Sequence, residues 1–267
     1  MKSYKTFLLE SEGPLLGLPQ KPIDLGNGKT HVPGPNQKIR NIASDYMKSA
    51  GLPYNPPKDY KPVDPDRATR IAGEFGKMKH DPSHPDVKAS YDAMKNETLA
   101  QYQHMKKSGL KIDWIKDGQE DPYKKTPHMG AADVRDNNHL WAYKTEHGFG
   151  SGGTSDSDHP LLQDSGEESG GHKMLHNDVF RVVHDYFGHF KEGNGFRAGG
   201  EENAWRQHSA MYSPLARGAM TSETRGQNSY VNYGPNGEHN RKASAGDTIY
   251  ADQKVGLMPD WTHKEGA

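Results

Sequence analysis

Apolar residues recur at spacings of three and four in several stretches, which places them on one face of a helix. The longest such stretch runs from residue 86 to residue 107, and shorter ones cover residues 37–49 and 65–79. Gly109 follows the longest stretch, where a glycine commonly ends a helix. The positions that share a face of this stretch are Val87, Tyr91, Met94, Thr98, Tyr102 and Met105. We therefore predict two amphipathic helices, over residues 65–79 and 86–107, and at most a short helix over residues 37–49.

Strands are predicted only in short stretches. Residues 110–115 largely alternate between apolar and polar, and residues 140–143 are a second candidate. The segment between them contains two prolines and is expected to be a loop. Residues 148–171 are mostly Gly, Ser, Asp and Glu, so we expect either a mobile lid or a plain surface loop. Residues 230–235 could form a strand or coil.

Three further helices are predicted between residues 176 and 226. The first buries Val179, Phe180, Val183 and Phe187. The second covers about residues 200–212, and the third about residues 214–224, with a proline in its first turn. The expected fold class is α+β, mainly α: a helical metal-binding core with a few short strands and long irregular loops.

The composition excludes several classes of protein. The 267 residues include no cysteine, so any metal must bind to His and carboxylate side chains. No run of eighteen apolar residues is present, so we expect no membrane span. A net charge of -1 argues against a dedicated nucleic-acid-binding protein. Only 31% of residues are hydrophobic, which indicates either partial disorder or a small core.

Two histidines at the end of the first of these predicted helices are candidate metal ligands. His184 and His189 are five residues apart, or roughly 140° round an ideal helix. They can converge only if the helix ends or distorts between them, and Gly188 is the residue where it could do so. Two imidazoles with one carboxylate form the facial triad of non-haem Fe(II) enzymes. Glu201, Glu202 and Glu223, on the two later predicted helices, are the candidate carboxylates.

The stretch Val179–His189 resembles the iron-binding stretch of the aromatic amino acid hydroxylases, whose His-Asp/Glu-x-x-Gly-His core binds iron through both histidines. That family takes its third ligand from a Glu in a Thr-x-Glu context near a Gly, and Thr221–Glu223 before Gly226 is similar. The resemblance implies Fe(II) bound by His184, His189 and Glu223. Glu201 or Glu202 is the rival third ligand, and Zn or Mn is the alternative to iron. Phe190–Lys191 stands where the family has a proline, so the use of a pterin does not follow.

Three other residues near the histidines are candidates for a catalytic role. They are Asp185, Glu201 and His208. Asp185 or His208 could orient a metal ligand from outside the coordination sphere. The structural alternatives are a helix-dipole role for Glu201 and Glu202 in a first helical turn, an ion pair for Glu223 and a core position for His208.

The N-terminus indicates a possible location for the protein. Residues 1–10 resemble the capsid-targeting peptide of internal head proteins in T-even-like phages, which a prohead protease removes after a sequence such as Leu8-Leu9-Glu10. The alternative is an ordinary N-terminal helical turn. The resemblance implies the virion interior or the host cytoplasm, with the prohead protease and the capsid interior as partners. We expect a Pro/Gly-rich extended arm over residues 11–62 and one metal-binding catalytic domain over residues 63–267.

Three functions are compatible with these features. The leading one is a non-haem Fe(II)-dependent oxygenase, a monooxygenase-like oxidoreductase acting on a small-molecule substrate. The second is a metal-dependent phosphohydrolase, because His184-Asp185 resembles the paired His-Asp of that superfamily, where a divalent metal activates water. The third is a phage internal or structural protein without catalysis.

Overall fold

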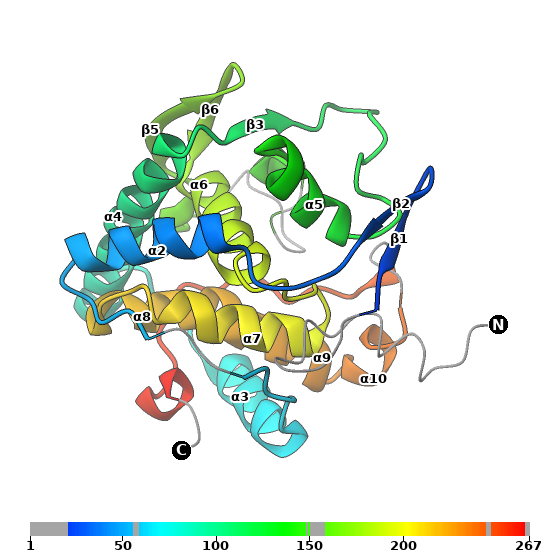
Figure 1. Ribbon diagram of the computed structural model, residues 1–267. Helices are drawn as coiled ribbons and strands as arrows, with labels where there is room; N and C mark the ends of the chain where they lie inside the picture. The colour runs from blue at the N-terminus through cyan, green and yellow to red at the C-terminus, as the bar shows by residue number, and fades with distance from the viewer. Residues whose placement is uncertain (1–20, 56–58, 148, 150–157, 244–246, 265–267) are drawn as a thin grey trace.

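The structure is a computed structural model, and it describes residues 21–55, 59–147, 149, 158–243 and 247–264. It is mainly helical with a few short strands, as the sequence predicted. Figure 1 shows helix α6 near the centre of the molecule, with α2, α4, α5 and α7 around it. Within the described residues, no helix combines the length and the apolar character that a membrane span requires. The candidate targeting peptide, residues 1–10, lies outside the described residues.

The three amphipathic helices of the first half form as predicted. They are α2 (Gln37–Ser49), α3 (Pro65–Lys77) and α4 (Pro85–Lys107). Side chains of Asn36, Asp64 and His84 accept hydrogen bonds from the first backbone N–H groups of these helices, which fixes where each begins. Proline occupies the first position of α3 and α4, where a backbone N–H has no helical partner.

A hairpin that we did not expect lies within the segment predicted to be an extended arm. Strands β1 (Ile23–Gly26) and β2 (Lys29–His31) pair antiparallel through a tight turn. Gly26 and Gly28 have φ values of 92° and 73° there, which glycine adopts readily. Helix α2 buries its apolar face in the same core as α6. The core residues that α2 supplies are Ile39, Ala43, Tyr46 and Met47.

Both strands predicted in the middle of the chain are present. Strand β3 (Lys111–Trp114) pairs in parallel with β4 (His139–Ala142). The expected loop between them contains helix α5 (His128–Asn137), which provides the crossover that parallel strands require. Helix α5 is only ten residues long, and Pro127 precedes it directly. The prolines in this segment therefore led to the prediction of a loop.

Two other segments also differ from the expectation. Residues 164–169, expected to be part of a loop or lid, form strand β5 (Asp164–Ser169), which pairs with β6 (His172–Leu175). Alternate β5 residues are exposed to solvent, so this strand can form although its residues are polar. Residues 230–235, expected to be strand or coil, belong largely to helix α9 (Gln227–Tyr233).

The second half of the chain forms the predicted helices, with two wide turns. Helix α6 (His176–His184) continues into the π-helix η3 (Asp185–Phe190), and α8 (Pro214–Thr221) continues into the π-helix η4 (Ser222–Gly226). Helix α7 (Ala198–Ser209) packs against η3. The remaining α-helix described in this half is α10 (Gly237–Asn240), and short 3-10 helices cover Thr145–His147, Pro160–Leu162 and Asp260–His263.

A histidine joins the parallel strands to α5 and should make stability depend on pH. His139 Nδ1 lies 2.7 Å from Asp133 Oδ2, and its Nε2 lies 3.1 Å from Asp113 Oδ2. Burial alone would lower the pKa of His139, but the hydrogen bonds with Asp133 and Asp113 outweigh burial and raise this pKa. The stabilisation is therefore complete below the unfolded pKa of roughly 6.5 and is lost as pH rises through the folded pKa.

We expect His139→Gln to lower the free energy of unfolding more at pH 5.5 than at pH 8.5. The difference should be on the order of 1 kcal/mol or less, because these groups keep contact with solvent. Urea unfolding at both pH values measures it. His104→Gln is the control, because the ring of His104 makes its hydrogen bond to a backbone carbonyl and not to a carboxylate. An equal loss at both pH values would contradict the prediction.

Candidate metal centre

The π-helix η3 brings the two candidate histidine ligands together. In a π-helix the hydrogen bonds join residues five apart, which widens the turn. The backbone N–H of Lys191 bonds to Tyr186 O at 3.0 Å in this pattern. His184 and His189 therefore project from the same side, and their ring centroids are 5.1 Å apart. The helix distorts between the two histidines, as their spacing required.

Gly188 allows the distorted helix to pack closely. A Cβ atom at this position would lie 3.2 Å from Ala204 O in α7 and 3.2 Å from the His184 ring. Both distances are shorter than ordinary van der Waals contact, so a larger residue would push η3 away from α7 or displace the imidazole. The amide of Asn194 also donates to Gly188 O at 2.9 Å, which satisfies a carbonyl freed by the distortion.

Helix α7 supplies a carboxylate to the pair of imidazoles. Glu201 Oε2 lies 3.5 Å from His189 Nε2 and 4.0 Å from His184 Nε2. Within the described residues, these three side chains are a group whose ligand atoms all lie within 4.8 Å of one another. Metal–ligand bonds of roughly 2.1 Å place ligand atoms about 3.0–3.4 Å apart, so a small movement would suffice for coordination. The group could therefore hold a metal ion.

The surroundings of His189 direct its Nε2 atom toward Glu201. Its Nδ1 lies 3.0 Å from the backbone carbonyl of Gly195 and can only donate there. The proton on Nδ1 leaves Nε2 with a lone pair, which is the form of imidazole that binds a metal. The ring also stacks on Phe196 with centroids 4.0 Å apart. His189 is 1% exposed, whereas the side chain of Glu201 is 26% exposed, so the group is open on the side of Glu201.

A chain of buried hydrogen bonds fixes the orientation of His184. Gln101 Nε2 donates to Met211 O at 3.3 Å, which turns Gln101 Oε1 toward His208 Nε2 at 2.9 Å. The second ring nitrogen of His208, Nδ1, lies 3.0 Å from His184 Nδ1. Burial, followed by the charges of His184 and Lys191, lowers the pKa of His208 well below its usual value.

The neutral His208 ring determines where the protons lie. Its single proton is on Nε2 and is donated to Gln101 Oε1, so its Nδ1 accepts the proton of His184 Nδ1. The lone pair of His184 is therefore on Nε2, on the side of Glu201. His208, expected as a residue that orients a ligand, occupies the position that this role requires.

Charge couples the imidazoles and the carboxylate before any metal binds. Burial opposes the charge of Glu201, but His189 and His184 outweigh this effect and lower the pKa of Glu201 to about 2. Burial would likewise lower the pKa of His189, and Glu201 and Asp185 raise it instead. A metal ion competes with a proton for Nε2 of His189, so metal affinity should fall as pH decreases.

Asp185 adjoins the group without belonging to it. It follows His184 directly in the chain, at the start of η3. Burial of its carboxyl group raises the pKa of Asp185, although His189 and His184 act in the opposite direction. A carboxyl group with a raised pKa beside metal ligands is suited to accept and release a proton.

Glu223 does not lie with the two histidines, and this corrects the ligand that the sequence favoured. Its Oε1 lies 2.5 Å from Tyr91 Oη and 3.1 Å from His159 Nε2, and its Oε2 accepts a bond from Gln227 Nε2 at 2.9 Å. His159 Nδ1 accepts from Leu161 N, so its Nε2 carries the proton that it donates to Glu223. Three donors thus hold this buried carboxylate within a separate polar cluster.

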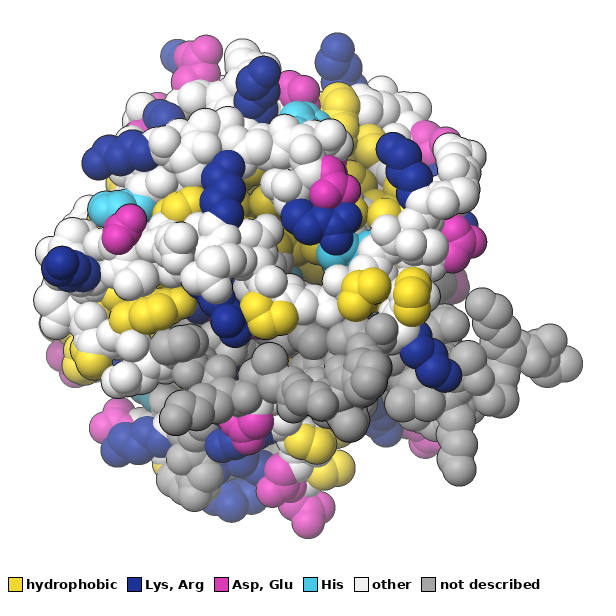
Figure 2. Space-filling model, viewed as in Figure 1, with side chains coloured by type: hydrophobic (Ala, Val, Ile, Leu, Met, Phe, Trp, Pro, Cys, Tyr) yellow, Lys and Arg dark blue, Asp and Glu magenta, His cyan; other side chains and the backbone are white. Residues whose placement is uncertain are grey.

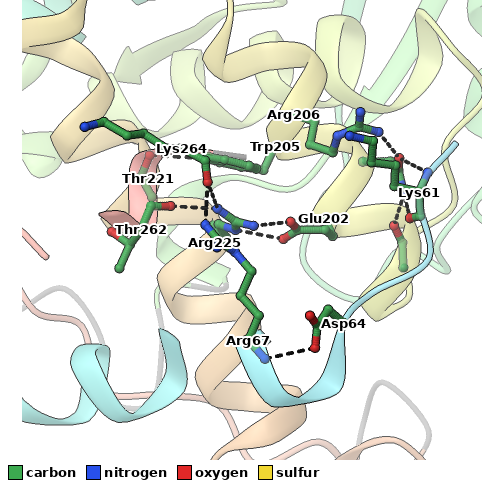
Figure 3. Close-up of polar contacts among 12 residues, drawn as sticks. Lys61, Asp64, Arg67, Glu202, Trp205, Arg206, Thr221, Arg225, Thr262 and Lys264 are labelled. Carbon is green, nitrogen blue, oxygen red and sulfur yellow. Dashed lines mark hydrogen bonds and ion pairs between the residues drawn. The ribbon is translucent and has the colours of Figure 1, made fainter. Parts of the chain in front are cut away.

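Glu202, the other alternative ligand, faces a different partner. Arg225 Nε donates to Glu202 Oε2 at 3.0 Å, and a second hydrogen bond joins the same two side chains. The guanidinium of Arg225 lies over the Trp205 ring, 3.8 Å from its centroid. Figure 3 shows Arg225 between Glu202 and the backbone carbonyls of Thr262 and Lys264, to which it also donates. Glu202 therefore anchors α7 to η4, and Glu201 is the carboxylate that reaches the histidines.

Sequence reasoning missed Gln101, although the sequence carried a signal for it. Gln101 lies three residues after Thr98 and four before Met105, on the apolar face of α4. It is fully buried, and buried polar side chains require a hydrogen-bond partner. A glutamine on the apolar face of a helix thus predicts a buried polar network, but its partner could not be identified from the sequence.

Comparison of the chain with known proteins gives no match to a family model, a curated protein or a solved structure.

The identity of the third ligand can be tested by substitution. We expect Glu201→Ala to weaken Co²⁺ binding at least ~100-fold, more than the loss of an outer hydrogen bond would cost. Glu223→Gln should leave the affinity unchanged and lower the free energy of unfolding by about 1–3 kcal/mol, because Glu223 accepts buried hydrogen bonds. Titration with Co²⁺, followed by visible absorption, measures binding. Retained affinity in Glu201→Ala, or lost affinity in a folded Glu223→Gln variant, would contradict the assignment.

The hydrogen-bond chain to His184 makes a second prediction. Gln101→Leu removes the acceptor for His208 Nε2–H, so His184 is no longer held in one tautomer. We expect the Co²⁺ affinity to fall about 10–100-fold. Thr98→Val is the matched control, because it removes a buried hydrogen bond to Tyr212 from the same face of α4. If both variants lowered the affinity equally, loss of stability rather than loss of orientation would be the cause.

Proposed function

We propose that this chain is a non-haem Fe(II)-dependent oxygenase that hydroxylates a small molecule, with His184, His189 and Glu201 as iron ligands. The observation that carries the proposal is the convergence of two imidazole Nε2 atoms and one carboxylate from separate helices. This donor set is the facial triad of non-haem iron oxygenases, which leaves positions open for substrate and O₂. When bound there, Fe(II) would supply the oxygen chemistry.

The residues around the group support an oxygenase. Phe196 stacks on the His189 ring, and Phe180 stacks on the His184 ring with centroids 6.0 Å apart. These aromatic walls would exclude water from the inner side of the site. The partly exposed Glu201 marks the side from which a substrate could enter. The proposal differs from the hydroxylase resemblance in its third ligand. This ligand is Glu201, twelve residues after His189, and not Glu223.

A metal-dependent phosphohydrolase is the second candidate, and Asp185 is the observation that favours it. Its carboxyl group has a raised pKa and adjoins a metal ligand. In a hydrolase, Asp185 would take the proton from a water molecule activated by a divalent metal. His184-Asp185 is also the pair that resembles the motif of that superfamily.

We further propose that the protein is carried in a phage head and acts in the virion interior or the host cytoplasm. The support is the resemblance of residues 1–10 to a capsid-targeting peptide. The enzyme and packaging proposals are independent, because a packaged protein can be an enzyme delivered to the host.

Metal analysis of protein purified without oxygen tests the oxygenase. We expect about one equivalent of iron, which is lost in Glu201→Ala and retained in Glu202→Gln. The iron-loaded protein should consume oxygen when given its substrate, and a panel of small aromatic carboxylates is the first to test with an oxygen electrode. Oxygen consumption should be absent in Glu201→Ala.

Two outcomes would overturn the oxygenase proposal. Zinc or manganese in the purified protein, with release of phosphate from nucleotides, would identify the phosphohydrolase. No bound metal, even after reconstitution with Fe(II), would leave the non-catalytic internal head protein as the better hypothesis.

A further inference from the structure

Two buried histidines outside the proposed ligand set lie close to it. His31 ends strand β2 and is 5% exposed, and His128 begins helix α5 and is 6% exposed. Their rings stack with centroids 6.0 Å apart. They come from segments almost a hundred residues apart, and neither was singled out in the sequence.

Contacts with the region around η3 hold both histidines near the metal centre. Helix α5 packs on η3, where a Cβ atom at Gly130 would lie 3.1 Å from the Phe190 ring. The segment after His31 is tied to the end of η3 by a hydrogen bond from Asn36 N to Lys191 O at 2.9 Å. Burial, and then the charge of His189, lowers the pKa of His128 to about 4, which places His128 within electrostatic range of a ligand.

The proton of His31 can be located from its neighbours. Arg135 donates from its NH1 group to His31 Nδ1 at 2.8 Å, so the imidazole proton is on Nε2. This buried Nε2–H has no hydrogen-bond partner within the described part of the chain. The ring of His128 likewise makes no hydrogen bond with the described residues. A buried donor without an acceptor, such as His31 Nε2–H, is rare in proteins and calls for a ligand or a functional explanation.

We propose that His31 and His128 form the wall of a binding site for a carboxylate-bearing ligand at the metal centre, and donate hydrogen bonds to that carboxylate. The inference rests on the metal centre proposed above and adds the chemical class of its substrate. A divalent ion with the single charge of Glu201 leaves a net positive charge, which attracts an anion. Two neutral imidazole N–H groups match the oxygens of a carboxylate.

The surface is open in this region. Figure 2 shows a hollow beside the place that β2 and α5 occupy in Figure 1. Hydrophobic and histidine side chains are visible within the hollow, and Lys or Arg and Asp or Glu side chains border it. A small carboxylate with an apolar body suits such a lining.

Acetate binding to the Co²⁺-loaded protein tests the proposal. The metal is added first, and sodium acetate is then titrated at constant ionic strength while the visible spectrum of Co²⁺ is recorded. We expect His128→Phe and His31→Phe to bind Co²⁺ like the wild type and to bind acetate about tenfold more weakly, which is the loss expected for one hydrogen bond to a charged group. His31→Gln, which keeps an N–H donor, should retain most of the acetate affinity.

The outcomes separate this inference from the proposed function. Co²⁺ binding with the same acetate affinity in wild type, His31→Phe and His128→Phe would overturn the carboxylate site and leave the metal centre intact. Co²⁺ binding without any effect of acetate on the wild-type spectrum would do the same. Failure of the wild type to bind Co²⁺ would overturn the proposed function and, with it, this inference. His239→Phe is the matched control, because His239 is exposed and its ring bonds to the backbone carbonyl of Asp247.

Discussion

The geometry of the candidate metal centre depends on the widened turn between His184 and His189. In a regular α-helix these side chains would diverge by roughly 140°, and no single ion could contact both. Hydrogen bonds between residues five apart bring them to one side. The turn persists because its surroundings stabilise it: Gly188 packs against α7, and Asn194 satisfies the carbonyl of Gly188. The same contact with α7 brings Glu201 to the imidazoles.

Different contacts orient the two imidazoles, although both rings end with Nε2 facing Glu201. A backbone carbonyl within the following loop fixes His189, so this constraint is local in sequence. His184 depends on His208 and Gln101, which come from α7 and α4. Both arrangements leave Nε2 as the ligand atom. The site thus requires the packing of α4, α6 and α7 around one core and could not form from the His-containing segment alone.

Much of the fold follows from the sequence because its helices are long and periodic. The boundaries of α2, α3 and α4 agree with the apolar spacing, and capping side chains mark where they begin. Elements that depend on tertiary contacts were not predicted. Strand β5 is composed of polar residues and exists through pairing with β6, and the short helix α5 follows a proline. His184 and His189 were identifiable because the five-residue spacing and Gly188 are local features.

The choice between Glu201 and Glu223 shows where local sequence ceases to be informative. Each carboxylate lies near the start of a partly buried helix. The sequence motif around Glu223 resembles a known iron-ligand motif more closely than the sequence around Glu201 does. Their partners distinguish them. Tyr91, His159 and Gln227 donate to Glu223, so its oxygens are already occupied by hydrogen bonds. The side-chain partners described for Glu201 are His184 and His189. A carboxylate whose neighbours are themselves potential ligands gains most from a metal ion, because one ion can bind all three groups at once.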